Sequence, residues 1–421
     1  MYNLESIQAV DNSLFSKEFI KPLYDSFCFS KIPTSIYSLL TGKEPQLGLP
    51  PSCFIPKESY DAVFLFFLDG FAWRFCEHYK DHPFLHRFYQ SGIVSKLTAQ
   101  FPSTTAAEVS TIHTGLEVGQ TGIYEWFQYE PQVDRIIAPL LFAYAGDKIA
   151  HSLLGSEISP SSFFPFKTIY QKMHSEEITS YLFQHASLTS PYAQSASKEA
   201  HVTSYFTLKQ GLSSIKELMS KEVNNKIYGM FYYSNIDSVG HRKGVDSQEL
   251  KDEILSTLDL LEEMMQSLVK TDKKIAILVT ADHGMSRVDP NTTIYLNQEL
   301  PQFSSFLKRG KDGALLVPAG SCRDFFLYVK EDCLEEAFIL LTDFFQGKGE
   351  VWKVSDLISL GFFGSQVSSR FLERVGNIVV LPYEGESVWW FEKHRFEQHF
   401  YGAHGGLTRE ELEISFLFGA F

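Results

Sequence analysis

Residues 62–70 read AVFLFFLDG, an uninterrupted apolar run that ends directly in Asp69 and Gly70. Three more short runs also end in a polar cluster: residues 92–101 (GIVSKLTAQF), 227–233 (IYGMFYY) and 275–279 (IAILV). All but the run at 92–101 are continuous rather than alternating, which is typical of strands buried on both faces of a parallel sheet. Amphipathic stretches separate the runs. This alternation predicts an α/β fold with a doubly wound, mostly parallel sheet and helices on both faces.

Two other parts of the chain lack this alternation of strands and helices. Residues 1–60 read as short helices and loops, so we expect an N-terminal helical extension that packs on the core. Residues 291–400 are rich in Phe, Gly and charge with mixed signals, and predict an inserted cap subdomain. The core is then formed by residues 61–290 and 401–421, where the segment EISFLFG at 413–419 returns as a late strand.

The composition is that of a globular chain with a large core. Of 421 residues, 44% are apolar and 21% are charged, which excludes a disordered or fibrous protein. The 37 Lys and Arg residues are outnumbered by 51 Asp and Glu residues, for a formal net charge of −14. Because phosphate backbones and anionic lipids require a basic surface, we expect neither a nucleic-acid polymer nor a membrane as a partner. A small phosphate compound can still bind where metal ions supply positive charge.

The cysteines and the N-terminal sequence predict the cellular compartment of the protein. The five cysteines are odd in number, scattered and without a CxxC pair, which predicts free thiols in a reducing compartment. The opening MYNLESIQAVDNSLF lacks a basic region followed by an apolar stretch, and the longest apolar run is far shorter than the roughly 18 residues of a membrane span. We therefore expect a cytoplasmic protein. The oligomeric state stays open.

Residues that commonly bind metals follow three of the four runs. They are Asp69, then Asp237 and His241 (DSVGH), then Asp282 and His283 (ADHG), with His404 (YGAHGG) before the last run. Ligands bind at the carboxyl ends of the strands in doubly wound sheets, so we expect the loops that carry these six side chains to meet at one rim. Mixed His and Asp donors suit zinc or a similar divalent ion better than calcium or magnesium. Six ligands suffice for two ions, and a metal pair about 4 Å apart can clamp a phosphoryl transfer.

A candidate nucleophile lies in the segment FPSTTAAEVSTIHTG at 101–115. We expect a helix from Thr105, capped by Ser103 or Thr104. A hydroxyl at a helix N-terminus lies beside backbone N–H groups and the positive end of the helix dipole, where a phosphate would be held. Taken alone, a Ser-Thr-Thr segment before a helix much more often supplies only a helix cap.

Together these segments resemble the alkaline phosphatase superfamily, and most closely its type I phosphodiesterase/nucleotide pyrophosphatase family. The matching motifs stand in the family's order: LDG at Asp69, the Thr-Thr segment before Thr114-Gly115, DSVGH, TADHGM at 280–285 and HGGLTREE at 404–411. The resemblance implies an alkaline-phosphatase-like fold with two divalent ions, with zinc as the preferred metal. Asp69, Asp282 and His283 would hold one ion together with the nucleophile, and Asp237, His241 and His404 would hold the other.

The resemblance also implies a reaction. Counting back from Thr114-Gly115 without a gap places the nucleophile at Thr105, with Thr104 as the alternative. Thr105 would attack phosphorus, form a covalent threonine intermediate and be released by water, so that a phosphodiester or pyrophosphate bond of a small, possibly nucleotide-type substrate is cleaved. The aromatic residues Tyr124 and Trp126 are candidates for substrate contacts.

Two alternatives stay open. The family tends to carry a histidine before the glycine matched by Gly122, where this chain has Thr121. The preference for diesters over monoesters is therefore undecided, and a phosphomonoesterase or phosphomutase of the same superfamily is the first alternative. The second is a non-catalytic binding protein that keeps the fold.

Overall fold

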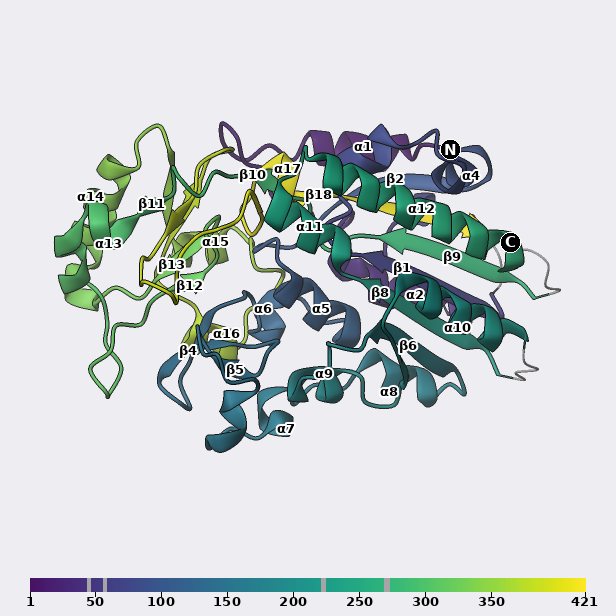
Figure 1. Cartoon of the computed structure of the whole chain (residues 1–421), viewed down its shortest axis with the longest axis horizontal. Helices are drawn as coiled ribbons and strands as arrows, with labels where there is room; N and C mark the ends of the chain where they lie inside the picture. The colour runs from purple at the N-terminus through teal and green to yellow at the C-terminus, as the bar shows by residue number, and fades with distance from the viewer. Residues whose placement is uncertain (44–46, 56–58, 221–224, 269–272) are drawn as a thin grey trace.

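A seven-stranded sheet forms the centre of the protein in the computed structural model, which describes residues 1–43, 47–55, 59–220, 225–268 and 273–421 (Figure 1). Its strand order is β2-β18-β9-β1-β8-β6-β7. The strands are β1 (Ala62–Leu68), β2 (Ile93–Thr98), β6 (Thr179–His185), β7 (His201–Tyr205), β8 (Ile227–Tyr233), β9 (Ile275–Thr280) and β18 (Glu413–Ala420).

The sheet is parallel except at β18. β1 is central, with Ala62 opposite both Ile227 of β8 and Ile275 of β9 in parallel register. β18 runs antiparallel to both β9 and β2, between which it lies. Every residue of β1 and β9 is buried, as a continuous apolar run requires when helices cover both faces. The predicted α/β fold and the late strand are thus confirmed.

Helices cover both faces of the sheet. Phe66 of β1 and Phe231 of β8 share one face with Tyr205 of β7 and with Gly211 of α10 (Leu208–Ser220). Phe67 points the other way and contacts Phe29 of the N-terminal segment. On the first face, α12 (Gln248–Leu268) packs between α4 (Pro83–Ser91) and α10 (Leu208–Ser220). On the second, α5 (Thr105–Thr114) packs between α2 (Ile32–Thr41) and α8 (Ile169–His174). Among the described residues, no helix combines the length and apolar character needed to cross a bilayer.

The N-terminal segment lies along the edge of this core. It holds α1 (Leu4–Asp11) and α2 within the described part of residues 1–60. Tyr2 forms a bridge to Val94 and Cys28 to Thr98, so the segment follows β2.

The residues between β9 and β18 form a second sheet, which lies beside the core (Figure 1). Its order is β12-β13-β15-β14 and its pairs are antiparallel. The strands are β12 (Ala319–Gly320), β13 (Phe325–Leu327), β14 (Gly349–Lys353) and β15 (Ile378–Pro382), with α14 (Leu334–Phe344) against β14. We call residues 291–400 the cap.

A third, smaller sheet lies within residues that the sequence analysis left undivided in the core. It joins β3 (Gln128–Glu130), β4 (Arg135–Ala138) and β5 (Ala143–Tyr144). Its own apolar cluster includes Ile137, Phe142 and Phe163. These strands are too short to stand out as periodic segments in the sequence, which is why the sequence analysis missed them.

Candidate active site

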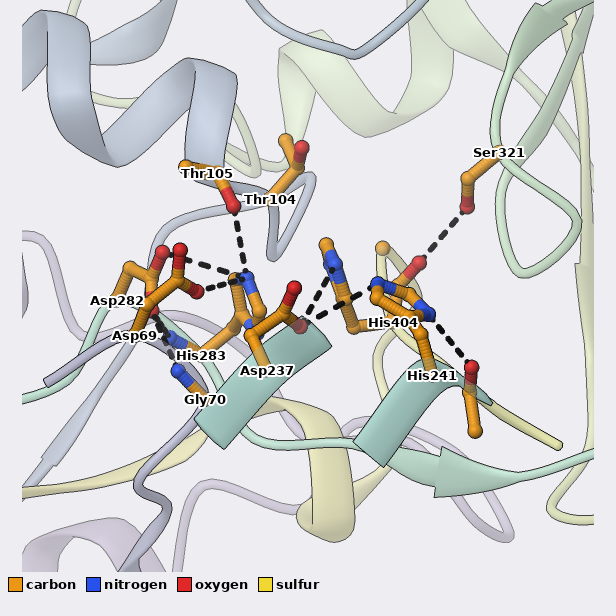
Figure 2. A network of polar contacts seen from close by, with 12 residues as sticks. Asp69, Gly70, Thr104, Thr105, Asp237, His241, Asp282, His283, Ser321 and His404 are labelled. Carbon is orange, nitrogen blue, oxygen red and sulfur yellow. Dashed lines mark hydrogen bonds and ion pairs between the residues drawn. The ribbon is translucent and has the colours of Figure 1, made fainter. Parts of the chain in front are cut away.

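The six predicted ligand side chains lie together (Figure 2): five follow the carboxyl ends of β1, β8 and β9, and His404 comes from the segment after β17 (Gly402–Ala403). Asp69 directly follows β1, and Asp282 and His283 follow β9. The expectation that all six lie in loops is wrong for Asp237 and His241, which lie on α11 (Asn235–Lys243). Their spacing of four residues places both on one helix face, directed at the same point.

Gly70 allows this convergence. Its φ is +74°, and a Cβ at this position would lie 3.1 Å from Asp237 Cα. Any other residue would therefore be strained in its backbone and would push α11 away from β1.

Each of the three histidines is held through its Nδ1 atom by a backbone carbonyl. The Nδ1 distances are 2.7 Å from His241 to Gly402 O, 2.9 Å from His283 to Gly284 O, and 3.0 Å from His404 to Ser103 O. An Nδ1–H that donates to a carbonyl leaves the Nε2 lone pair available for a metal ion. The three imidazoles are thus oriented as ligands before any ion binds.

The ligand atoms form two adjoining groups that share Asp237. Asp237 Oδ1 lies 3.3 Å from His241 Nε2 and 3.7 Å from His404 Nε2. His283 Nε2 lies 3.5 Å from Asp69 Oδ1 and 3.3 Å from Asp282 Oδ2. In each of the sets Asp237–His241–His404 and Asp69–Asp237–His283, the ligand atoms lie within 4.8 Å of one another. Asp237 therefore lies between the two groups instead of belonging to one alone.

Three carboxylate oxygens at this rim have no hydrogen-bond partner among the described residues: Asp69 Oδ1, Asp237 Oδ1 and Asp282 Oδ2. A buried carboxylate oxygen without a partner is costly. The second oxygen of each outer carboxylate is satisfied, since Tyr232 donates to Asp69 Oδ2 and Gly70 N donates to Asp282 Oδ1 at 3.1 Å. The unsatisfied oxygens face the histidine Nε2 atoms, and this donor set fits divalent cations.

The pKa shifts of the carboxylates and of His404 also indicate a site for a cation. Burial raises the pKa of Asp69 well above its usual value, and the charges of Asp282 and Asp237 raise it further. Burial also raises the pKa of Asp237, against the opposing effect of His241. The pKa of His404 is lowered by burial and then by His283 and His241. A cation between these groups would favour the ionised carboxylates and the neutral imidazoles together.

The two candidate hydroxyls differ in direction (Figure 2). Thr105 is half-buried, and its Oγ1 lies 3.1 Å from His283 Nε2. Thr104 is 1% exposed and caps α5, because its Oγ1 accepts a hydrogen bond from Ala106 N. Thr105 is thus directed at the candidate ligands, whereas Thr104 caps the N-terminus of α5.

Two cavities open on either side of Thr105. We call them the Asp69-side cavity, of about 370 Å³, and the His241-side cavity, of about 400 Å³. Thr105, Trp126 and Asp237 line both. The Asp69-side cavity is largely apolar, with Val109, Leu140, Leu141, Leu182, Leu188 and Met230. The His241-side cavity is lined by Phe127, Trp389, Phe396 and Phe400 together with Glu125, Arg395, Glu397 and Gln398. A larger cavity of about 650 Å³, between the N-terminal segment and the cap, is lined by none of the six ligands.

The two aromatic candidates for substrate contacts are placed differently. Trp126 is 40% exposed and stands in the wall between the two cavities. Tyr124 lines neither cavity: it is fully buried, hydrogen-bonds Tyr328 and packs on Phe326 of the cap. A substrate contact at Tyr124 is therefore a wrong prediction for this structure, since the side chain joins the cap to the core.

The sequence analysis missed Glu125 and Arg395 as cavity residues. Glu125 lies next to Trp126 in the same aromatic stretch. An acidic residue among aromatic residues could have indicated a residue that lines a cavity. Arg395 lies in the cap, outside every quoted motif, and the fold brings it to the site.

His113 of α5 lines the Asp69-side cavity and gives a pH-dependence prediction. Burial lowers its pKa to about 4, and its Nδ1 lies 2.8 Å from Tyr170 Oη. Unfolded His113 takes up a proton as the pH falls through about 6.5, whereas folded His113 resists until about 4. The free energy of unfolding should therefore drop by about 2 kcal/mol between pH 7 and pH 5 on account of this residue. Urea titrations of wild type and His113→Gln at both pH values measure it, and an equal drop in the variant contradicts it.

Comparison with known proteins agrees with this geometry. A family model described as type I phosphodiesterase / nucleotide pyrophosphatase matches residues 63–406. Ectonucleotide pyrophosphatase/phosphodiesterase family member 3 of Mus musculus is 23% identical over an alignment of 305 residues that covers 67% of this chain. The chain spans only about a third, 31%, of that relative's length.

Solved structures share the fold. Murine ectonucleotide pyrophosphatase/phosphodiesterase 5, in one case an inactive threonine-to-alanine variant in complex with AMP, matches with a TM-score of 0.62 at 18% identity. The alignment covers 84% of this chain and 87% of the murine one. The human protein of the same name matches with a TM-score of 0.61 at 20% identity, over 85% of this chain and 87% of its own. With the family model covering most of its length, the chain belongs to the type I phosphodiesterase/nucleotide pyrophosphatase family.

Proposed function

We propose that this protein is a metal-dependent phosphohydrolase that cleaves a phosphodiester or pyrophosphate bond through a covalent intermediate on Thr105. The observation that carries the proposal is the convergence of three carboxylate oxygens without a hydrogen-bond partner among the described residues and three imidazole Nε2 atoms beside the Thr105 hydroxyl. Such a set costs stability unless cations fill it. Family membership supports hydrolysis of this bond class.

The cofactor in this proposal is a pair of divalent ions, and the mixed His and Asp donors favour zinc. Asp69, Asp282 and His283 would hold one ion and His241 and His404 the other, with Asp237 placed between them. When bound, the ions polarise the phosphate and lower the pKa of a coordinated hydroxyl.

The side chains and backbone of the protein would carry out two chemical steps. In the first step the Thr105 oxygen forms a bond to phosphorus while the bond to the leaving ester oxygen breaks. Water then replaces the Thr105 oxygen on phosphorus and regenerates the hydroxyl. The N-terminus of α5 would present backbone N–H groups to the phosphate, and the position of Thr105 Oγ1, 3.1 Å from His283 Nε2, directs this hydroxyl at the site.

The two cavities favour a diester over a monoester. A diester carries two substituents on phosphorus, and Thr105 has a cavity on each side with Trp126 between them. A monoester would use only one. The murine relative's complex with AMP makes a nucleotide a reasonable candidate for one of the substituents.

The test compares two chromogenic esters on zinc-loaded protein. We expect bis-p-nitrophenyl phosphate to be hydrolysed with a kcat/KM at least about tenfold above that of p-nitrophenyl phosphate, because only the diester fills both cavities. Faster cleavage of the monoester would identify a phosphomonoesterase instead. No hydrolysis of either ester by protein with two bound metal equivalents would point to a binding protein.

We also propose that the protein works in the cytoplasm and acts on small molecules, without a nucleic-acid polymer or a membrane as partner. The charge of −14 argues against nucleic-acid polymers and anionic membranes as partners, and all five cysteines are free thiols, as a reducing cytoplasm would keep them.

A further inference from the structure

The turn that carries His404 lies against the segment that carries Thr105. Residues 404–406 (HGG) and Ser103 are far apart in sequence, yet four hydrogen bonds join them. Two of these bonds use the backbone of Ser103. Its O lies 3.0 Å from His404 Nδ1, and its N donates to Gly405 O at 3.2 Å. The turn and the nucleophile segment are therefore held together as one unit.

The other two hydrogen bonds belong to the hydroxyl of Ser103. Its Oγ accepts from Gly405 N at 3.2 Å and donates to Gly406 O at 2.8 Å. Ser103 is fully buried, and both glycines are buried as well, so bulk water cannot take over these bonds. Without the hydroxyl, one N–H and one C=O of the turn would lack a partner among the described residues. Such groups are costly in the interior, and a shift of the turn would relieve that cost.

Other residues hold the turn from its opposite side. Gly406 N donates to Glu411 Oε1 at 3.1 Å, and a Cβ at Gly406 would lie 2.7 Å from Glu411 Oε2. Ser321 Oγ lies 2.8 Å from His404 O (Figure 2). These contacts attach the turn to the C-terminal part of the core and to the cap. The attachment to the nucleophile segment comes from Ser103.

A second set of contacts connects His404 to Thr105. The imidazole rings of His404 and His283 are stacked, with centroids 3.5 Å apart and planes inclined by 14°. His283 Nε2 in turn lies 3.1 Å from Thr105 Oγ1. Because Ser103 precedes Thr105 by two residues, a shift of the turn would change the position of the His404 ring relative to the Thr105 hydroxyl. A misplacement of about 1 Å between reacting groups can cost about 10²-fold in rate.

We propose that Ser103 is a positioning residue: its hydroxyl holds the turn 404–406 on the nucleophile segment and thereby sets the position of His404 Nε2 relative to Thr105 Oγ1. This inference rests on the proposed function, because it concerns the same nucleophile and the same ligands. Ser103 acts through the turn and not on the substrate. Groups that orient a metal ligand in this way typically account for about 10- to 100-fold in metal affinity.

The test compares two buried serines whose hydroxyls have the same hydrogen-bonding pattern. Ser6 Oγ accepts from Lys96 N at 3.0 Å and donates to Asn3 O at 2.9 Å. Ser6 is fully buried in the N-terminal segment and lines neither cavity beside the nucleophile. Ser6→Ala and Ser103→Ala should therefore shift the midpoint of urea unfolding by similar amounts. Ser6→Ala is thus the control for the loss of a buried serine without the loss of the proposed positioning.

Zinc titration of metal-free protein, in competition with a chromogenic chelator, measures the dissociation constants of the bound ions. We expect Ser103→Ala to raise one constant by about tenfold or more and to leave the other within about twofold, whereas Ser6→Ala leaves both unchanged. At saturating zinc, kcat of Ser103→Ala on bis-p-nitrophenyl phosphate should fall about tenfold with KM within about twofold, since geometry and not substrate binding is altered. Unchanged constants and kcat in Ser103→Ala, or equal losses in Ser6→Ala, would overturn the inference.

A double variant assigns the effect to His404. His404→Ala should retain one zinc equivalent. Addition of Ser103→Ala to this variant should leave the dissociation constant of the remaining ion unchanged, because the ligand through which Ser103 acts is gone. A further loss of affinity in the double variant would show that Ser103 only supports the fold.

The same measurements separate this inference from the proposed function. Wild type that binds two zinc ions without hydrolysing the diester, together with selective weakening of one ion in Ser103→Ala, would refute the proposed function alone. Hydrolysis by wild type, with no effect of Ser103→Ala on either the ions or kcat, would refute the inference alone.

Discussion

The Thr105→Ala variant is expected to lose at least about 10³-fold in kcat on bis-p-nitrophenyl phosphate, because removal of a nucleophile abolishes the covalent route. Thr105 Oγ1 is 3.1 Å from His283 Nε2 and opens on both cavities. Its loss should hardly change stability, since the side chain is half-buried and its hydrogen bond to His283 is replaceable by water. Mass spectrometry of acid-quenched wild type should detect a peptide whose Thr105 carries a p-nitrophenyl phosphoryl group, since only one of the two ester bonds breaks in the first step, and the variant should lack it.

Thr104→Ala is the matched control on the neighbouring hydroxyl. It removes the cap of α5 and should cost about 1 kcal/mol in the free energy of unfolding. Its kcat should stay within about tenfold of wild type, because the capping group only positions Thr105. The reverse pattern, with an inactive Thr104→Ala and an active Thr105→Ala, would transfer the nucleophile to Thr104.

The second large effect is expected at Asp237, which lies between the two ligand groups. Asp237→Asn should lower the bound metal below two equivalents and reduce kcat by about 10³-fold, because both ions depend on its carboxylate. Metal content by elemental analysis and kcat at saturating zinc measure the two effects separately. Full metal content in the variant would contradict the shared position.

The same variant should be more stable than wild type once metal is removed. In metal-free protein, Asp237 Oδ1 is a buried oxygen without a hydrogen-bond partner in the described part of the chain, and burial and the charge of Asp282 both raise its pKa. A raised folded-state pKa means that stability falls as the pH rises from about 4 towards that pKa, so the gain should appear at pH 8 and vanish near pH 4. We expect about 1 kcal/mol in urea titrations with chelator. Asp246→Asn, an exposed partner of Arg287, should change nothing measurable.

The sequence predicts the fold and the convergence of the six candidate ligands, for a local reason. Asp69 comes directly after β1 and Asp282 two residues after β9, and both strands are continuous apolar runs, so the place of these residues at the sheet rim follows from the pattern alone. His404 needs the order of the family motifs as well. These residues depend on short stretches of chain, and a single sequence holds that information.

What the sequence does not contain is the direction of side chains in irregular segments. Tyr124 and Trp126 are two residues apart in one aromatic stretch, yet one is in the core and the other between the cavities. Arg395 reaches the site only through the cap, whose short strands carry weak periodicity. That Arg395 and Thr105 line the same cavity is a property of tertiary packing, which no local pattern encodes.

The Nδ1 contacts of the three histidines have a consequence for how this protein tolerates change. Gly402, Gly284 and Ser103 hold the imidazoles by main-chain oxygens, which every amino acid possesses. Mutations that swap the surrounding side chains thus leave ring orientation intact so long as the chain keeps its path. Lineages can drift far apart in sequence while the imidazole geometry persists, and a designer could rebuild the cavity walls without retuning the metal-binding rings.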